Sequence, residues 1–147
     1  MAEFSILATS YGEVLANPRA PYILVQWKGP VTAEQFMAVV GRALLFAETT
    51  ITPLRSWAWI SDARPILPLP PAAVEWTERV FIPRAQALGI REVGVVMEQC
   101  YPERIVIRPP EQLACAGRAF ARELRFRYFD SVEEAKREVC RCLLPGF

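Results

Sequence analysis

Side chains that could do chemistry gather in one stretch of the chain, residues 56–90. The apolar run Trp57–Ser61 predicts a buried strand, Asp62 ends it, and Arg64 follows two residues later. A side chain at the carboxyl end of a strand in an α/β sheet can reach a ligand-binding crevice. An Asp beside an Arg could therefore bind or act on a small molecule. Such pairs more often anchor a loop, and we favour that structural interpretation.

A ligand pocket is the sharper hypothesis for the same stretch. Trp76 and Arg84 lie on the helix predicted to follow, so a site at the strand ends would be lined by Asp62, Arg64, Trp76 and Arg84. The chain has no histidine, which rules out Ser-His and Cys-His nucleophile pairs and removes the usual acid–base group at neutral pH. It also has no Walker loop and no GxGxxG motif. We therefore expect a protein that is not an enzyme.

Protein docking is a different role for this region, and it would use the loop Ala63–Pro71. Prolines hold that loop near polyproline geometry and lower its entropy. Ile66, Leu67 and Leu69 are expected to be exposed on it. A rigid loop with apolar side chains facing solvent is typical of a surface that binds another protein.

Length, composition and net charge narrow the class of protein. A length of 147 residues with 52% hydrophobic residues predicts a single globular domain, residues 1–147. The net charge of +1 gives no general attraction to nucleic acid or to acidic membranes. The strand predicted at Arg125–Phe129 alternates arginines with aromatics, as RNA-binding sheets do, but an amphipathic strand with its apolar face inward is the simpler interpretation.

Location and cofactors follow from equally simple observations. The first residues do not resemble a signal peptide, and the apolar segment Val31–Phe46 is interrupted by Glu34 and Arg42, so we expect a cytoplasmic protein without a membrane span. Cys140 and Cys142 lie two apart in a predicted helix and point in different directions, and no CxxC spacing occurs. We expect reduced, mostly buried thiols, no metal and no cofactor.

The secondary-structure pattern that must position these residues alternates strands and helices. The expected strands are Phe4–Thr9, Gly12–Ala16, Tyr22–Trp27, Trp57–Ser61, Glu92–Met97 and Arg125–Phe129. The expected helices run from Thr32 to about Thr49, from Pro70 or Pro71 to Gly89, from Glu111 to Glu123, and from Ser131 to about Leu144. This order predicts an α/β fold with a mixed, mainly parallel sheet, an N-terminal hairpin and about four helices.

Local signals sharpen the helix boundaries. Thr32 with Gln35, and Ser131 with Glu134, match the capping box that opens a helix. Pro83 lies inside the second helix, where its missing N–H predicts a kink or loosened turn near Arg79–Phe81. The segment Cys100–Pro110 is left without an assigned structure.

Three tryptophans raise the question of oligomeric state. If helices cover only one face of the sheet, an exposed face carrying Trp27, Trp57 and Trp59 would be too apolar for a monomer. This predicts a homodimer through a sheet face or through the edge hairpin. The alternative is that helices bury both faces of the sheet.

Several short motifs resemble the bacterial STAS-like proteins, a divergent branch related to the anti-sigma-factor antagonist domain. They are YILVQWKGPV at residues 22–31, WISDAR at 59–64, Glu75-Trp76 with Pro83-Arg84, and YFDSVEEA at 128–135. The resemblance covers about residues 10–143. It implies the antagonist-type fold, an α/β domain that begins with a hairpin.

The same resemblance implies a docking surface but not a switch. Regulatory members of the family are controlled by phosphorylation of a Ser or Thr in the loop that corresponds to Ala63–Pro71. That loop contains neither residue in this chain, while Ser61 precedes it and Thr77 follows it, so no phosphosite is carried over.

Two classes of function remain open. The first is a non-enzymatic regulatory or protein-interaction module, whose partner, such as a signalling regulator, contacts the loop and the helix that begins at Pro71. The second is a small-molecule-binding protein or enzyme with a pocket near Asp62, which a closed apolar cavity beside that residue would favour. We favour the first class.

Overall fold

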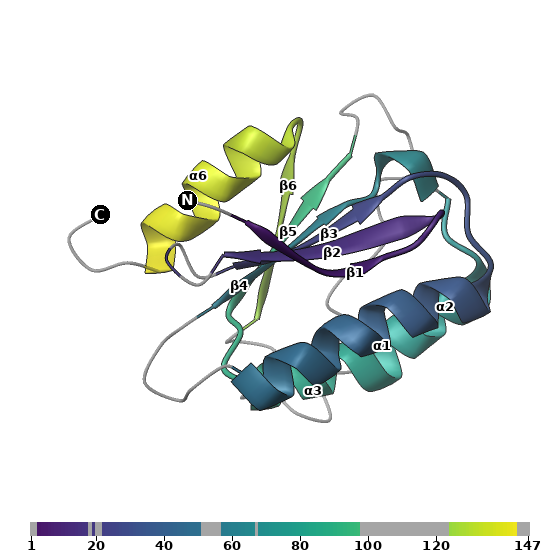
Figure 1. Cartoon of the computed structure of the whole chain (residues 1–147). Helices are drawn as coiled ribbons and strands as arrows, with labels where there is room; N and C mark the ends of the chain where they lie inside the picture. The colour runs from purple at the N-terminus through teal and green to yellow at the C-terminus, as the bar shows by residue number, and fades with distance from the viewer. Residues whose placement is uncertain are drawn as a thin grey trace.

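The computed structural model describes residues 3–17, 19, 22–50, 57–66, 68–97 and 124–143, and its strands form one six-stranded sheet. The strands follow one another across the sheet in chain order. They are β1 (Phe4–Ala8), β2 (Gly12–Asn17), β3 (Tyr22–Trp27), β4 (Ala58–Asp62), β5 (Glu92–Val96) and β6 (Arg125–Phe129). Figure 1 shows the sheet between two layers of helix.

The sheet is mixed, as the sequence predicted. β1 pairs with β2, and β2 with β3, in antiparallel fashion, so the chain does begin with a hairpin. The pairs β3–β4, β4–β5 and β5–β6 are parallel. A bulge at residue 6 shifts the register between Ser5 and Leu7.

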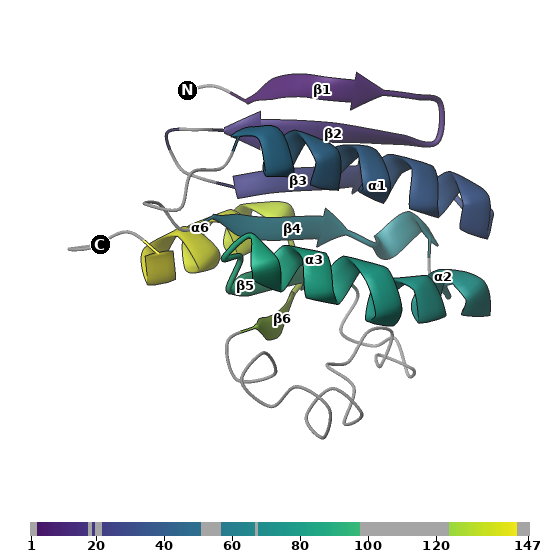
Figure 2. The ribbon, with the colours of Figure 1, turned by 90° about the horizontal axis from the view of Figure 1, so that it is seen from below.

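Helices cover both faces of this sheet. On one face lie α1 (Ala33–Thr50) and a continuous helical run made of α2 (Pro71–Trp76), η2 (Thr77–Phe81) and α3 (Ile82–Ala87), whereas α6 (Val132–Leu143) lies on the other (Figures 1 and 2). α1 and the α2–α3 run share a face because both connect neighbouring strands in the same direction with the usual right-handed crossover. The described residues thus hold three helical segments; the fourth expected helix, 111–123, and the segment 100–110 lie outside them.

The turn η2 explains how the chain accommodates Pro83. It is a π-helical turn, in which the carbonyl oxygen of Thr77 accepts a hydrogen bond from the N–H of Ile82 five residues later. Proline has no N–H to return to Arg79, so the wider turn takes up the missing bond. The predicted disturbance at Arg79–Phe81 is confirmed.

The helix starts are also confirmed. The N–H of Gln35 donates to Thr32 Oγ1 at 3.1 Å, and the N–H of Thr32 donates to Gln35 Oε1 at 3.0 Å. At α6 the N–H of Glu134 donates to Ser131 Oγ at 3.1 Å. Each cap satisfies amide groups that have no partner inside the helix.

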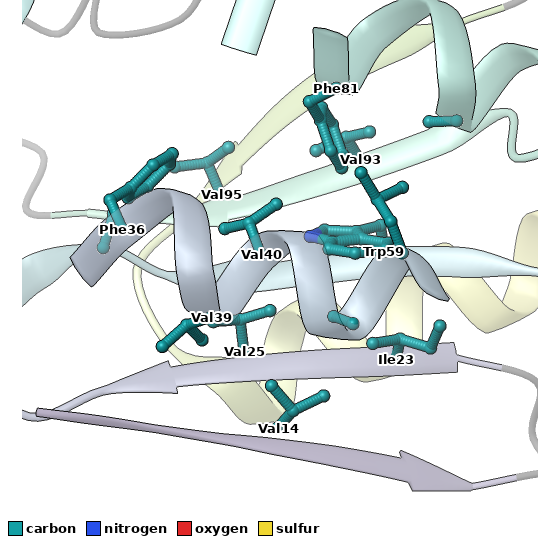
Figure 3. Packing of buried hydrophobic residues seen from close by; sticks show 14 of the residues in the cluster. Val14, Ile23, Val25, Phe36, Val39, Val40, Trp59, Phe81, Val93 and Val95 are labelled. Atoms are coloured by element: carbon teal, nitrogen blue, oxygen red, sulfur yellow. The ribbon is translucent and has the colours of Figure 1, made fainter. Parts of the chain in front are cut away.

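The main core lies between the sheet and helices α1 to α3, and it contains all three tryptophans that raised the dimer question. Trp59 is 2% exposed and packs edge-on against Phe81, with 4.8 Å between ring centroids (Figure 3). Trp27 stacks on Phe36, and Trp57 is buried as well. The premise of an exposed tryptophan-bearing sheet face is therefore wrong, because the helices between the parallel strands cover that face.

A smaller core lies on the opposite face, between α6 and strands β3 to β6. It includes Leu24, Ile60, Phe129 and Val139. No helix within the described ranges is both long and apolar enough to span a membrane.

Candidate functional site

Asp62 lies at the carboxyl end of β4, level with Gln26 on β3 and Val96 on β5. Its side chain is buried, yet three side-chain N–H groups donate to it. Gln26 Nε2 lies 2.5 Å from Oδ2, while Arg64 Nε lies 2.8 Å from Oδ1 and Arg64 Nη2 lies 2.7 Å from Oδ2. The structure thus brings Asp62 and Arg64 together, as the sequence suggested.

This geometry matches a loop anchor. The two-pronged contact with Arg64 fixes the start of the 3-10 turn η1 (Arg64–Ile66), and the N–H of Ala63 donates to the Val96 carbonyl at 3.0 Å. A bidentate guanidinium pair orients a carboxylate and occupies both of its oxygens. Asp62 therefore holds the strand end and the loop together.

An Arg64→Met variant is expected to lose about 2–3 kcal/mol of unfolding free energy, because Asp62 would keep its buried charge with Gln26 as its one remaining side-chain donor. The Arg64 side chain is 41% exposed, which keeps the loss below that of a fully buried pair. Urea denaturation measures it. The matched control Arg79→Met breaks an exposed pair with Glu75 and should change stability by less than about 0.5 kcal/mol. Equal effects of the two variants would contradict the anchoring role.

Trp76 and Arg84 do not join this pair. Arg84 on α3 forms a bidentate ion pair with Glu48 on α1, with contacts of 2.8 and 2.7 Å. Trp76 packs edge-on against Phe36 at 6.2 Å between ring centroids. Ser61 faces the main core, where the Trp27 indole N–H donates to it, so the next residue, Asp62, faces the opposite side of the sheet. Trp76 and Asp62 accordingly belong to different faces.

The expected exposure of the loop side chains is wrong for two of the three apolar residues. Ile66 is 4% exposed and Leu69 is 9% exposed, and both belong to the main core. The reason is the turn η1, in which the N–H of Ile66 donates to the Ala63 carbonyl at 3.1 Å and folds the chain back on the sheet. Leu67 lies outside the described residues.

A small apolar cavity of about 30 Å³ lies inside the main core, beside the π-helical turn. Trp59, Phe81, Val93 and Val95 contribute to its lining (Figure 3). The volume is about the space that one water molecule takes up in the liquid, which is too small for a metabolite. Ser61, and not Asp62, borders it, so this cavity does not supply the pocket that a small-molecule function beside Asp62 would require.

A second hollow is a groove of about 400 Å³ between the β1–β2 hairpin and α1. Leu7, Thr9 and Tyr11 form the hairpin side, and Gly41, Arg42 and Leu45 belong to the helix side. We call this groove, together with strand β1, the β1–α1 edge. Leu45 is 53% exposed there, and Phe4, packed edge-on against Phe46, is 45% exposed.

Sequence reasoning missed the β1–α1 edge, although two signals were present. Leu45 lies outside the buried helical stripe that contains Leu44 and Ala47. Gly41 lies in the middle of an 18-residue helix, where a glycine makes the helix less stable than an alanine would by about 1 kcal/mol. A Cβ added at Gly41 would meet no atom within 4 Å. An apolar residue outside the buried stripe, close to a glycine that no tight contact requires, indicates a surface that another molecule approaches.

A polar cluster ties the N-terminal segment to α6 at the other end of the hairpin. The Tyr22 hydroxyl donates to Glu3 Oε2, and Lys136 Nζ lies 2.5 Å from the same oxygen. Burial, and then the hydrogen bond to Glu3, raises the pKa of Tyr22 to about 12. Burial alone would raise the pKa of Glu3, but hydrogen bonds from Lys136 and Tyr22 outweigh it and hold that pKa below its ordinary value.

These shifts predict that the free energy of unfolding depends on pH, through the contributions of Tyr22 and Glu3 to stability. Tyr22 binds its proton more tightly in the folded chain, so its contribution is complete below about pH 10 and is lost as the pH rises towards about 12. Glu3 has a lowered pKa, so its contribution is present above its ordinary pKa and is lost as the pH falls through the folded value. The ultraviolet absorbance of phenolate, measured against pH for wild type and Tyr22→Phe, isolates Tyr22. If Tyr22→Phe removes one tyrosine from the transition near pH 10, the shift is refuted.

The arginines of strand β6 form ion pairs within the fold. Arg125 Nη2 lies 2.8 Å from the buried carboxylate of Glu92, and Arg127 pairs with Glu138 at 3.5 Å. Phe126 packs against the main core, as the amphipathic interpretation of this strand predicted, but Tyr128, which that interpretation also placed inward, is exposed. Among the described side chains, no group of three or more His, Cys, Asp or Glu residues gathers in a way that could hold a metal ion.

The fold and these sites define an α/β protein with a mixed six-stranded sheet and helices on both of its faces. No family model, curated protein or solved structure matches the chain.

Proposed function

We propose that the protein is a non-enzymatic, cytoplasmic protein-interaction module of the STAS-like type, and that its docking surface is the β1–α1 edge. The partner is a protein, such as a signalling regulator. This keeps the function class that the sequence favoured and moves its surface away from the loop Ala63–Pro71, where Ile66 and Leu69 are buried.

The observation that carries the proposal is where apolar surface is left uncovered. The described residues include three large apolar side chains that are exposed, and two of them, Phe4 and Leu45, lie on the β1–α1 edge. Leu45 lines a groove of about 400 Å³ whose lining is mostly apolar, and Phe4 lies on the strand that forms one side of it. Exposed apolar side chains next to a concave surface are typical of protein-binding sites.

The alternative, ligand binding or catalysis beside Asp62, has less support. Its four proposed residues are divided between an ion pair at the end of β4, a core aromatic on α2 and an ion pair between α3 and α1. Both oxygens of the Asp62 carboxylate already accept hydrogen bonds from Arg64. A ligand would have to displace that guanidinium.

Affinity capture from the native host, compared between wild type and Leu45→Glu, tests the proposal. A charge at Leu45 should remove the captured partner while leaving the fold intact, because this side chain is mostly outside the core. The captured protein is then purified, and its binding to both chains is measured directly. We expect the variant to bind at least about tenfold more weakly.

The matched control is Ala72→Glu, which places the same charge on an exposed position of α2, next to the loop that the STAS-like resemblance implicates. It should keep the partner. If Ala72→Glu loses the partner and Leu45→Glu retains it, docking occurs at the loop and helix α2, and the β1–α1 edge is not the surface.

A further inference from the structure

We infer that the β1–α1 edge pairs with the same edge of a second copy of this chain, so that two β1 strands join antiparallel into one continuous sheet. The inference rests on the proposal that this edge is a docking surface, and it names the partner. Three observations carry it: an edge strand without charge or proline, a bulge that permits a symmetric register, and an exposed side chain that this register brings to a groove.

β1 is the first strand of the sheet, and no described strand pairs with its outer side. Its sequence, FSILA, contains no charge and no proline. Proteins usually protect an edge strand from pairing with charged residues or proline. An unprotected apolar edge next to exposed Leu45 is suited to pairing with another strand.

The bulge determines which register such a pair can adopt. Phe4 contacts Phe46, Ile6 and Leu7 pack on the main core, and Thr9 lines the groove, so all four face α1. Ser5 and Ala8 face the other side of the sheet, because Ser5 pairs with Leu15, which packs on the smaller core, and Ala8 pairs with Glu13.

Directly opposed residues in an antiparallel pair must lie on the same face of the sheet. A two-fold axis between Ile6 and Leu7 meets this condition at every position, because it places Phe4 opposite Thr9, Ser5 opposite Ala8, and Ile6 opposite Leu7. An axis through Ile6 itself would oppose Phe4 and Ala8, which face different sides. The bulge therefore permits the symmetric register that pairs residues 4–9 along their whole length.

That register brings an exposed side chain to a hollow. Phe4 of one copy lies opposite Thr9 of the other, and Thr9 forms part of the groove. Because the axis is two-fold, both copies supply one phenylalanine and receive one, as an isologous interface requires. Gly41, where an added Cβ would meet nothing, leaves room on the helix side of the same groove.

Light scattering on the purified full-length chain measures the mass across a concentration series. We expect particles of twice the 16.6 kDa chain mass, with the dissociation constant raised at least about tenfold by Phe4→Glu and by Leu45→Glu. Tyr128→Glu changes the exposed aromatic on β6, at the opposite edge of the sheet, and should leave the dimer intact. Circular dichroism confirms that each variant is folded.

Cross-linking tests the register. Chains carrying Ser5→Cys, mixed with chains carrying Ala8→Cys, should form a disulfide-linked dimer on oxidation, because these residues face each other and both are exposed. Each variant alone should link no more than wild type, which controls for the four native cysteines.

A wild-type mass of 16.6 kDa at high micromolar concentration overturns the inference, and so does a dimer that Tyr128→Glu dissociates while Leu45→Glu does not. The register is overturned if Ser5→Cys chains cross-link on their own and mixing them with Ala8→Cys chains gives no additional linked dimer. A monomer whose captured partner is lost with Leu45→Glu refutes the second copy but leaves the proposed function standing. A dimer with no captured partner supports the second copy alone.

Discussion

Replacing Trp59 with alanine is expected to lower the free energy of unfolding by about 3–5 kcal/mol. The side chain is almost fully buried between α1 and the α2–α3 run, and it packs against Phe81 on the π-helical turn. It also lines the cavity of about 30 Å³, so the space left by truncation would join an existing void instead of closing. A loss of this size is a large fraction of the stability of a typical domain.

Urea denaturation of wild type and variant measures this loss through the midpoint, provided the slope is unchanged. The control Trp59→Phe keeps an aromatic ring against Phe81 and should lose roughly 1–2 kcal/mol. If Trp59→Ala were no more destabilising than Trp59→Phe, the placement of this residue at the centre of the main core would be wrong.

Ile66→Ala is expected to destabilise the chain by about 2–4 kcal/mol, whereas Leu45→Ala should change its stability by less than about 0.5 kcal/mol. Both changes remove apolar side-chain carbons. Ile66 is buried under the turn η1, while more than half of the Leu45 side chain faces solvent. Burial, and not residue type, therefore decides the size of the effect.

Thermal or urea unfolding of the two variants, measured in parallel with binding, separates folding from docking. Ile66→Ala should lose stability, and the fraction that remains folded should still bind the partner. Leu45→Ala should keep its stability and lose affinity. The reverse pattern would restore the loop Ala63–Pro71 as the docking surface and remove the β1–α1 edge from that role.

Much of the fold could be predicted from the sequence because its signals are local. Period-two and helical patterns predicted the described strands and helices to within about two residues, and Thr32 with Gln35 predicted the start of α1. Pro83 predicted the altered turn at Thr77–Phe81. Each of these signals depends on contacts between residues at most a few positions apart, so the order of residues is sufficient to predict it.

The candidate site was predicted only in part. Asp62 and Arg64 meet because they are two residues apart at the end of one strand. Arg84 instead pairs with Glu48, which lies 36 residues away in the sequence, and nothing in either local pattern indicated that contact. The sequence shows which side chains are apolar but not which way they point. Ile66 and Leu69 were therefore expected to be exposed on the loop, although they are buried.

The sequence by itself determined the alternation of strands and helices, the hairpin start, the helix caps and the absence of histidine chemistry. Only the tertiary structure decided which side chains were covered. Strand order and crossover direction placed α1 to α3 over the tryptophan face and left Phe4 and Leu45 uncovered at the β1–α1 edge. The physical reason is that burial depends on what packs against a side chain, and that neighbour comes from a distant part of the chain.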